Sequence, residues 1–455
     1  MLQAILRPIF LSSLCVALAT GCSPTDGSGT PEYEELKPDD WPGGSMGGWS
    51  DEGDLNESWE MGEAESGGSG GDGDMEMSAS APEDMGGDTG CAPGDPGDPG
   101  SDDSWDEPNQ HGGLEGGEID DNELYEDFLG YIDEKLSQFG SDPMVHYLEI
   151  GQRHYIEVVD ANGRHVPDAT VTLVAGEQTI MGRTRADGQF AFFPLAYGNG
   201  AAEYSVTVES SVGTGEGTLQ QQDKLTIALD GVAEAERPVA VEIAFIIDAT
   251  GSMGEEIDRI KTTITQIADR IAELDGTTEL RFGLVDYRDR GDAYVTHAVD
   301  FTNNISAFQT AVNNVFAGGG GDMPEELNAA LHKGMRQLTW KAETALRIAF
   351  VVADAPAHHY EQEEYVYDQA MKDGARMGVK FFPIASGGSD GIAELQFRQL
   401  AQFTQGHFIF ITEGNGSSSG SGGSDYDVDE NDFQVEKLDD LVVRLVQEEV
   451  QSWVE

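Results

Sequence analysis

The sequence is poor in cysteine, in basic residues and in long apolar runs. It contains 3 Cys and 25 Lys or Arg among 455 residues, against 85 Asp and Glu, and its formal net charge is -60. Cys15 and Cys22 lie in the first segment, which leaves Cys91 without a partner and excludes a disulfide framework. The chain offers no basic face for phosphates, which argues against nucleic acid as a partner and favours cations or basic surfaces. After Cys22 no run of about 18 apolar residues follows, so no spanning helix is predicted there.

Residues 1–22 have the pattern of a secretory signal peptide. Arg7 precedes an apolar run of about a dozen residues, which is too short to span a membrane. The following Ala-Thr-Gly-Cys resembles a bacterial lipobox, although Leu18 is not at the preferred place three residues before the cysteine. The resemblance implies that Cys22 is acylated and anchors the chain to the membrane. Because Ser23 follows, we expect the outer membrane of a Gram-negative bacterium; an ordinary cleaved signal is the alternative.

Residues 23–118 are predicted to be a disordered acidic tether. Between Ser23 and Asn122 the sequence has 29 acidic residues and one basic residue, Lys37, in a background of Gly, Ser and Pro. Such a composition cannot bury enough apolar surface to offset its chain entropy. A flexible segment of this length has an end-to-end distance of about 50–60 Å. We expect it to hold the folded part of the chain clear of a membrane.

Periodic patterns predict folded structure from residue 119 onward. Residues 119–140 carry apolar side chains at helical spacing. Over 144–231, short alternating strands separated by turn residues predict a small antiparallel β-sandwich. Its segments VDANG, PDATV and TRADGQF resemble those of the carboxypeptidase regulatory domain. No peptidase accompanies them, so the resemblance implies a spacer or docking module.

Residues 237–455 alternate apolar strands with amphipathic helices. VAVEIAFIIDA and LRIAFVVADA are near-continuous apolar runs, and Ile257, Ile260 and Ile264 begin one apolar stripe of a helix. Buried parallel strands joined by such helices predict an α/β fold with a doubly wound, mostly parallel sheet. A flexible insert at 414–432 is expected before the last helix.

Oxygen-bearing side chains stand where these strands end, and ligands of open parallel sheets bind at that edge. Carboxylates that meet at one edge repel each other unless a cation lies between them, and hard oxygen ligands suit Mg²⁺, Mn²⁺ or Ca²⁺. An Asp that merely caps the next helix is the alternative for any single position. The candidate residues are Asp248, Thr250, Ser252, Asp286, Asp322 and Asp354.

The motif Asp248-x-Thr250-x-Ser252 resembles the Asp-x-Ser-x-Ser motif of von Willebrand factor type A domains. The resemblance covers about residues 237–455, and through RFGLVDYRD, GGGGDMPEE and DAPAHH it is strongest to the subgroup attached to alpha-kinases and in hemicentin-like proteins. It implies a divalent cation, with Mg²⁺ the first expectation. Asp286 and Glu325 are further candidates for the rim of the site. Asp322 stands where the family has threonine, and its charge is expected to favour Ca²⁺ or to weaken the attraction for an acidic ligand. The implied metal ligands are Asp248, Thr250, Ser252, Asp322 and Asp354.

Together these features predict a surface-tethered, non-enzymatic binding protein whose type A domain holds a protein or glycan ligand through a divalent cation. An envelope scaffold without a specific metal-dependent ligand is one alternative. A metal-dependent phosphoryl-transfer enzyme is less favoured, because Thr250 stands where the dehalogenase-type pattern has a second Asp. The segment HHYEQEE at 358–364 lacks the His-Glu-x-x-His spacing of zinc hydrolases and is interpreted as a rim loop.

Overall fold

A computed structural model describes residues 114–198, 200–233, 238, 240–273, 279–321, 323–361, 364–412, 426–428 and 432–454. The predicted signal peptide with Cys22, the predicted tether up to residue 113, Asp322 and most of the predicted insert therefore lie outside the described residues. Within the described part of the chain, no helix has the length and apolar character needed to cross a membrane.

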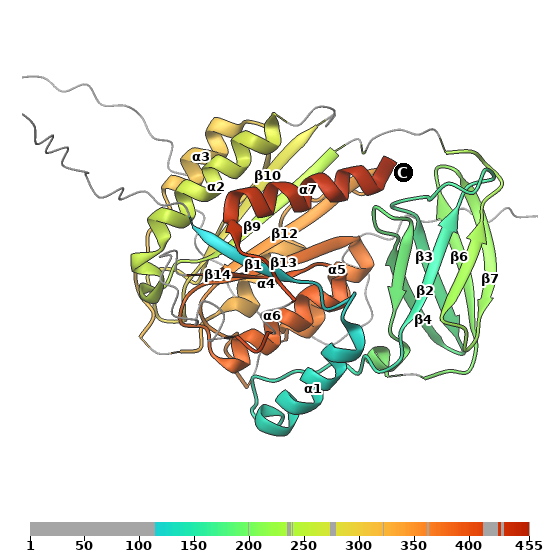
Figure 1. Ribbon diagram of the computed structural model, residues 1–455, viewed down its shortest axis with the longest axis horizontal. Coiled ribbons are helices and arrows are strands. Elements are labelled where there is room, and N and C mark those ends of the chain that lie inside the picture. The colour runs from blue at the N-terminus through green and yellow to red at the C-terminus, as the bar shows by residue number, and fades with distance from the viewer. Residues whose placement is uncertain are drawn as a thin grey trace, which may run out of the picture. The chain divides into compact units, whose positions relative to one another are not determined.

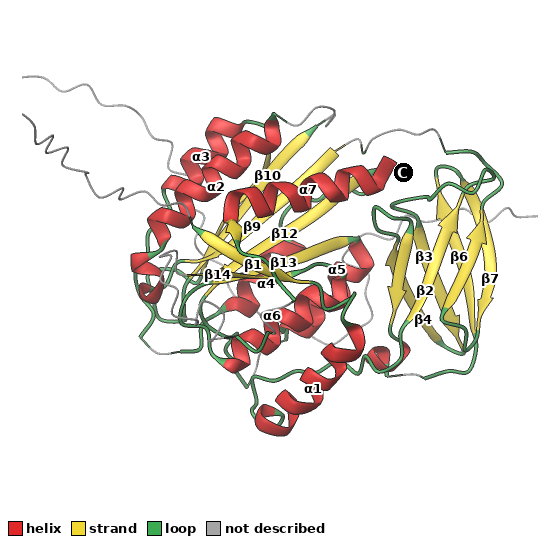
Figure 2. Cartoon of the chain, viewed as in Figure 1, coloured by secondary structure: helices red, strands yellow, loops and turns green. Residues whose placement is uncertain are grey.

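An eight-stranded sheet forms the centre of the α/β domain (Figures 1 and 2). Its strands run in the order β11-β10-β9-β12-β13-β14-β1-β15. The five strands from β10 to β14 in this order are parallel, whereas β11, β1 and β15 each pair antiparallel with a neighbour. This confirms the predicted α/β fold with a mostly parallel sheet. The strands are β1 (Glu115–Ile119), β9 (Ala240–Asp248), β10 (Leu280–Tyr287), β11 (Thr296–Thr302), β12 (Ala345–Ala353), β13 (Val379–Ala385), β14 (Phe408–Thr412) and β15 (Glu436–Lys437).

Helices cover both faces of this sheet (Figure 2). Successive residues of β9 point to opposite faces, so Ile243 and Phe245 enter one buried core while Ala244 and Ile246 enter the other. The first core is completed by α2 (Ile257–Ala272), α3 (Ile305–Asn313) and α7 (Leu438–Val454). The second is completed by α4 (Leu327–Arg336), α5 (Tyr367–Met377) and α6 (Gly391–Thr404). Because both faces are buried, the residues of β9 are apolar except for Glu242, which pairs with Arg281, and Asp248 at its end.

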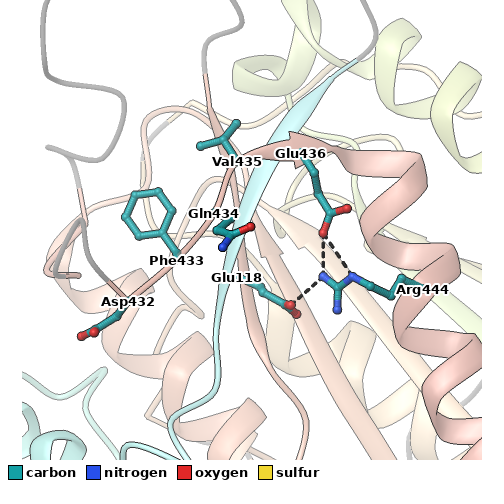
Figure 3. A pocket seen from close by; sticks show the side chains of 7 residues that line it. All are labelled: Glu118, Asp432, Phe433, Gln434, Val435, Glu436 and Arg444. Carbon is teal, nitrogen blue, oxygen red and sulfur yellow. Dashed lines mark hydrogen bonds and ion pairs between the residues drawn. The ribbon is translucent and has the colours of Figure 1, made fainter.

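The last residues assigned to the tether instead form a strand of the central sheet. β1 lies between β14 and β15, antiparallel to both. Arg444 of α7 donates to Glu118 of β1 and Glu436 of β15 at 2.6 Å each, beside a pocket of about 450 Å³ (Figure 3). The sequence EGGEI gives no strand signal, since glycine is depleted in strands. Gly117 is needed because a Cβ there would lie 2.6 Å from the Phe410 ring.

Helix α1 (Tyr125–Phe139) follows β1, within the segment 119–140 that was predicted to be helical, and packs on α6. Arg398 of α6 donates to both carboxylate oxygens of Asp121, at 3.0 and 2.6 Å, and lies 3.8 Å from the centre of the Tyr131 ring. The sheet and helices of the α/β domain therefore include residues well before position 237, where the sequence pattern alone placed the start of this domain.

Two smaller sheets with a common buried core occupy residues 154–228. The three-stranded sheet has the order β5-β2-β8 and the four-stranded sheet the order β4-β3-β6-β7. The pair β2 and β8 is parallel, which differs from the fully antiparallel sandwich expected from the sequence. The Phe193 ring stacks on Phe403 of α6 with a centroid distance of 5.0 Å, so this sandwich packs directly on the α/β domain. Its strands are β2 (His154–Val159), β3 (Thr170–Ala175), β4 (Gln178–Arg183), β5 (Gln189–Phe192), β6 (Tyr204–Ser210), β7 (Gly213–Leu219) and β8 (Lys224–Ala228), with a short 3-10 helix, η1 (Pro194–Tyr197), after β5.

Candidate metal centre

The candidate centre lies at the carboxyl ends of β9 and β12. β9 comes first in the chain among the parallel strands, with β10 on one side and β12 on the other, so the strand order reverses at this point. At such a reversal, the loops that follow two neighbouring strands run in opposite directions and leave a crevice at the carboxyl ends of the strands. Asp248 is the last residue of β9, and Asp354 directly follows β12. The sheet thereby brings together two carboxylates that are far apart in the sequence.

The loop after β9 is folded around the Asp248 carboxylate. The backbone amide and the hydroxyl of Thr250 both donate to Asp248 Oδ1, at 2.8 and 2.7 Å, and the Tyr287 hydroxyl donates to Oδ2 at 3.2 Å. The hydroxyl oxygens of Thr250 and Ser252 are 3.1 Å apart. Asp248 and Thr250 are fully buried, whereas Ser252 is exposed at the start of the short helix η2 (Gly251–Glu255). The three oxygen-bearing side chains thus lead from the interior to solvent.

Burial and mutual repulsion disfavour ionised carboxylates here. Burial, followed by the charge of Asp354, raises the pKa of Asp248 to about 7 despite the hydrogen bonds from Thr250 and Tyr287. Burial also raises the pKa of Asp354, against a hydrogen bond from Ser252 that lowers it. Asp354 Oδ1 is buried and has no hydrogen-bond partner. A buried acceptor without a donor is costly, and a cation would satisfy it.

Glu325 adds a third carboxylate to the surroundings of Asp248 and Asp354. It is 2% exposed, its Oε2 has no hydrogen-bond partner, and its backbone is held by Pro356 and His358. Burial and then the charges of Asp248, Asp289 and Asp354 raise its pKa to about 8. The sequence placed Glu325 on the rim; the structure makes it a buried neighbour of the centre.

The glycine run 318–321 lies against the Asp248 loop. Gly318 N donates to Ala249 O, and Gly251 N donates to Gly319 O, each at 3.0 Å. Gly320 has a φ of +65°, and a Cβ there would lie 2.7 Å from Glu325 Oε1, so any other residue would be strained and would displace the Glu325 carboxylate. This loop leads to Asp322, the predicted ligand that lies outside the described residues.

Asp286 points away from the centre. In the parallel register of β9 and β10, Tyr287 is opposite Asp248 and Asp286 is opposite Ile247. Side chains alternate along a strand, so Tyr287 reaches Asp248 and Asp286 faces the other side. The Asp286 carboxylate instead accepts from the Tyr294 hydroxyl at 2.5 Å and contacts His297 Nδ1 at 3.0 Å. We therefore leave Asp286 out of the ligand set, and Tyr287 is the contributor that the sequence analysis missed.

The described residues fit a hard cation through mixed carboxylate and hydroxyl oxygens. No three His, Cys, Asp or Glu side chains in the described part of the chain are grouped so as to hold a metal. The set available there is two carboxylates, Asp248 and Asp354, with the hydroxyls of Thr250 and Ser252. Oxygen donors of this kind suit Mg²⁺, Mn²⁺ or Ca²⁺. The Asp354 oxygen that lacks a hydrogen-bond partner is the observation that makes these four side chains compatible with a bound ion.

Residues 242–413 match the family model of the von Willebrand factor A domain. The chain contains a von Willebrand factor A domain. The match covers the loop after β9, the glycine run and the loop after β12, and so includes every residue of the candidate centre. Von Willebrand factor A domains commonly bind a divalent cation and commonly mediate protein interactions, so this domain suggests a role of the protein-interaction or adhesion type.

Two curated relatives share part of the chain. The alpha-protein kinase vwkA of Dictyostelium discoideum is 29% identical over 122 residues, which are 27% of this chain and 19% of the kinase. The putative ariadne-like RING finger protein R811 of Acanthamoeba polyphaga mimivirus is 29% identical over 119 residues, 26% of this chain and 11% of that protein. The matches therefore span less than a fifth of either relative. Among solved structures, proximal thread matrix protein 1 from the mussel byssus aligns with 39% of this chain and 47% of its own, at 12% identity and a TM-score of 0.29.

Proposed function

We propose that the protein is a non-enzymatic binding protein whose von Willebrand factor A domain uses a divalent cation to hold a protein or glycan ligand. Asp248, Thr250, Ser252 and Asp354 would hold the ion, and Asp322 is a further candidate from the sequence. A bound cation would offset carboxylate charge and present open coordination positions to an oxygen of the ligand. The observation that carries the proposal is the buried, unpartnered Asp354 oxygen beside Asp248.

Cation binding is tested by isothermal titration of the full chain with Mg²⁺, Mn²⁺ and Ca²⁺. Substitutions that only disturb the orientation of a ligand already cost about 10–100-fold in metal affinity. We therefore expect Asp248→Asn and Asp354→Asn to weaken binding at least that much. Asp286→Asn is the matched control, since it makes the same change at a neighbouring strand end whose carboxylate faces away. Absence of binding, or equal loss in the control, would contradict the proposal.

Ligand binding is tested separately, by probing glycan and protein arrays with the full chain in Mg²⁺ and in chelator. The proposal expects signals that disappear in chelator and in Asp354→Asn. A signal that persists in both would instead favour a scaffold that binds partners without a cation. Turnover of a phosphate ester that requires both Mg²⁺ and Asp248 would favour an enzyme.

We further propose that the chain is anchored through lipidated Cys22 in the outer membrane, with the acidic segment 23–113 as the tether and the sandwich as a spacer. The support comes from the sequence patterns alone. Metabolic labelling with a fatty acid should mark the wild-type chain and not Cys22→Ala, and the variant should leave the membrane fraction. Equal labelling and equal fractionation of the two chains would contradict the anchor.

A further inference from the structure

Two histidine rings from distant parts of the sequence meet beside the loop that follows β12. His146 Nε2 and His359 Nδ1 are 3.3 Å apart, and the ring centroids are 5.3 Å apart. His146 lies between α1 and β2, and His359 lies between β12 and α5. A separation of 213 residues explains why no local spacing motif reveals this pair.

The two ring nitrogens form a hydrogen bond in the absence of a metal, with the donor set by the tautomers of the two rings. Their separation of 3.3 Å is also compatible with both nitrogens binding one metal ion. Two nitrogens that each lie about 2.0–2.1 Å from a tetrahedral zinc ion are about 3.3–3.4 Å from each other. Imidazole is a preferred ligand of Zn²⁺ and of similar borderline cations. We propose that His146 and His359 form a second metal site, for a zinc-like ion, separate from the oxygen-lined centre.

Both histidines are held in place by groups that do not depend on a metal. Gln396 of α6 is 1% exposed, donates from Nε2 to Met144 O at 2.9 Å and accepts from Ala357 N at 2.6 Å. One buried amide therefore fixes both backbone segments. The backbone amide of His146 also donates to the Tyr367 hydroxyl at 2.8 Å. Such positioning lowers the ordering cost of bringing two ligands to one ion.

The site is open to water. Both histidines are partly exposed, and within the described residues no third His, Cys, Asp or Glu completes a metal-holding group with them. The remaining coordination positions of the proposed ion would therefore be filled by water molecules or by an oxygen or nitrogen atom of a ligand. The two sites also select different ions, because nitrogen donors favour Zn²⁺ whereas carboxylate and hydroxyl oxygens favour Mg²⁺ and Ca²⁺.

A metal at this pair would join the segment that leads into the sandwich to the loop of the oxygen-lined centre. His359 belongs to the loop that begins with Asp354. In the same loop, His358 N donates to Glu325 O at 2.7 Å and Pro356 O accepts from Glu325 N at 3.0 Å. An ion on His359 would therefore steady the loop that carries Asp354 and holds Glu325.

The test is a zinc titration of the full chain without a polyhistidine tag, in excess Mg²⁺ to occupy the oxygen-lined centre. We expect Zn²⁺ to bind and to raise the melting temperature. His146→Gln and His359→Gln should each weaken zinc binding by about tenfold or more, in line with the loss of a ligand. His154→Gln is the matched control, because its ring bonds a backbone carbonyl of the sandwich at 2.8 Å. The control should bind zinc as the wild type does.

The metal dependence of the stability change separates this proposal from a purely structural contact between the rings. If the rings only pack together, the variants lower the melting temperature equally with and without Zn²⁺, and this result would overturn the proposal. Zinc binding that is unchanged in both single variants would also overturn it. Retention of zinc binding in Asp248→Asn is expected, and loss there would show that the zinc had bound the oxygen-lined centre instead.

Discussion

Replacing Arg398 should show how strongly the segment before the sandwich is built into the von Willebrand factor A domain. The Arg398 side chain is buried, with 4% of it exposed, and it bonds several partners. It makes two bonds to Asp121, at 3.0 and 2.6 Å, and one to Glu394 at 3.2 Å. Both carboxylates are 2% exposed in their side chains. Arg398→Met would leave two buried carboxylates without this cation.

Removal of one partner from a buried ion pair costs about 3–5 kcal/mol. Because a tenfold change corresponds to about 1.4 kcal/mol, opening of α1 should become about two to four orders of magnitude more frequent. Native-state hydrogen exchange of the α1 amides in the full chain measures this quantity directly. The double variant Asp121→Leu with Arg398→Met should recover part of the loss, since an apolar replacement of a buried pair is often neutral.

Arg444 provides the matched control. It contacts three carboxylates, those of Glu118, Glu436 and Glu448, but 35% of its side chain is exposed. Exposed ion pairs contribute about 0–1 kcal/mol each and many contribute nothing measurable, so Arg444→Met should cost clearly less than Arg398→Met. If Arg444→Met costs as much as Arg398→Met, burial is not what makes the Asp121 contact strong and the reasoning is refuted.

Three further predictions concern the sheet and the candidate centre. A fragment of residues 237–455 lacks β1 and α1, so it should unfold at lower urea than the full chain and aggregate through the open edge of β14; equal urea midpoints would contradict this. Gly320→Ala should destabilise the chain by about 1–3 kcal/mol in urea unfolding, because alanine is strained at positive φ and its Cβ would meet Glu325; unchanged stability would show that the loop shifts freely. Without added cation, the free energy of unfolding should fall as pH rises from about 4 to about 8. The pKa values of Asp248 and Glu325 in the folded chain are raised to about 7 and about 8. The folded chain therefore holds more protons than the unfolded chain in this pH window. Added Mg²⁺ should reduce that loss, and urea midpoints at pH 5 and pH 8 for the wild type and Asp248→Asn check both the sign and its origin.

Local patterns were sufficient for the fold class and for the position of the main loop. The apolar run of β9 followed by Asp248, Thr250 and Ser252 predicts a buried strand that ends in oxygen ligands, because burial and side-chain alternation are properties of the segment itself. The amphipathic stripe of α2 is equally local. These signals required no knowledge of the rest of the chain.

Side-chain direction at the other strand ends was not predictable in the same way. Asp286 and Asp354 both stand at the end of an apolar strand, yet only Asp354 takes part in the centre. Which of two adjacent residues faces the centre depends on the register between strands, and a shift of one residue reverses it. Glu325 is similar, since its burial comes from the contacts of its loop with the loop after β12.

The sequence by itself determined the layered α/β architecture and the hard-oxygen character of the loop after β9, because periodicity and residue chemistry are written along the chain. Only the tertiary structure decided that the glycine-containing strand β1 completes the sheet, and that His146 meets His359. Both are contacts between segments whose own sequences carry little or no signal for the structure they form. Their free energy comes from partners supplied by distant parts of the chain, and no local pattern encodes those partners.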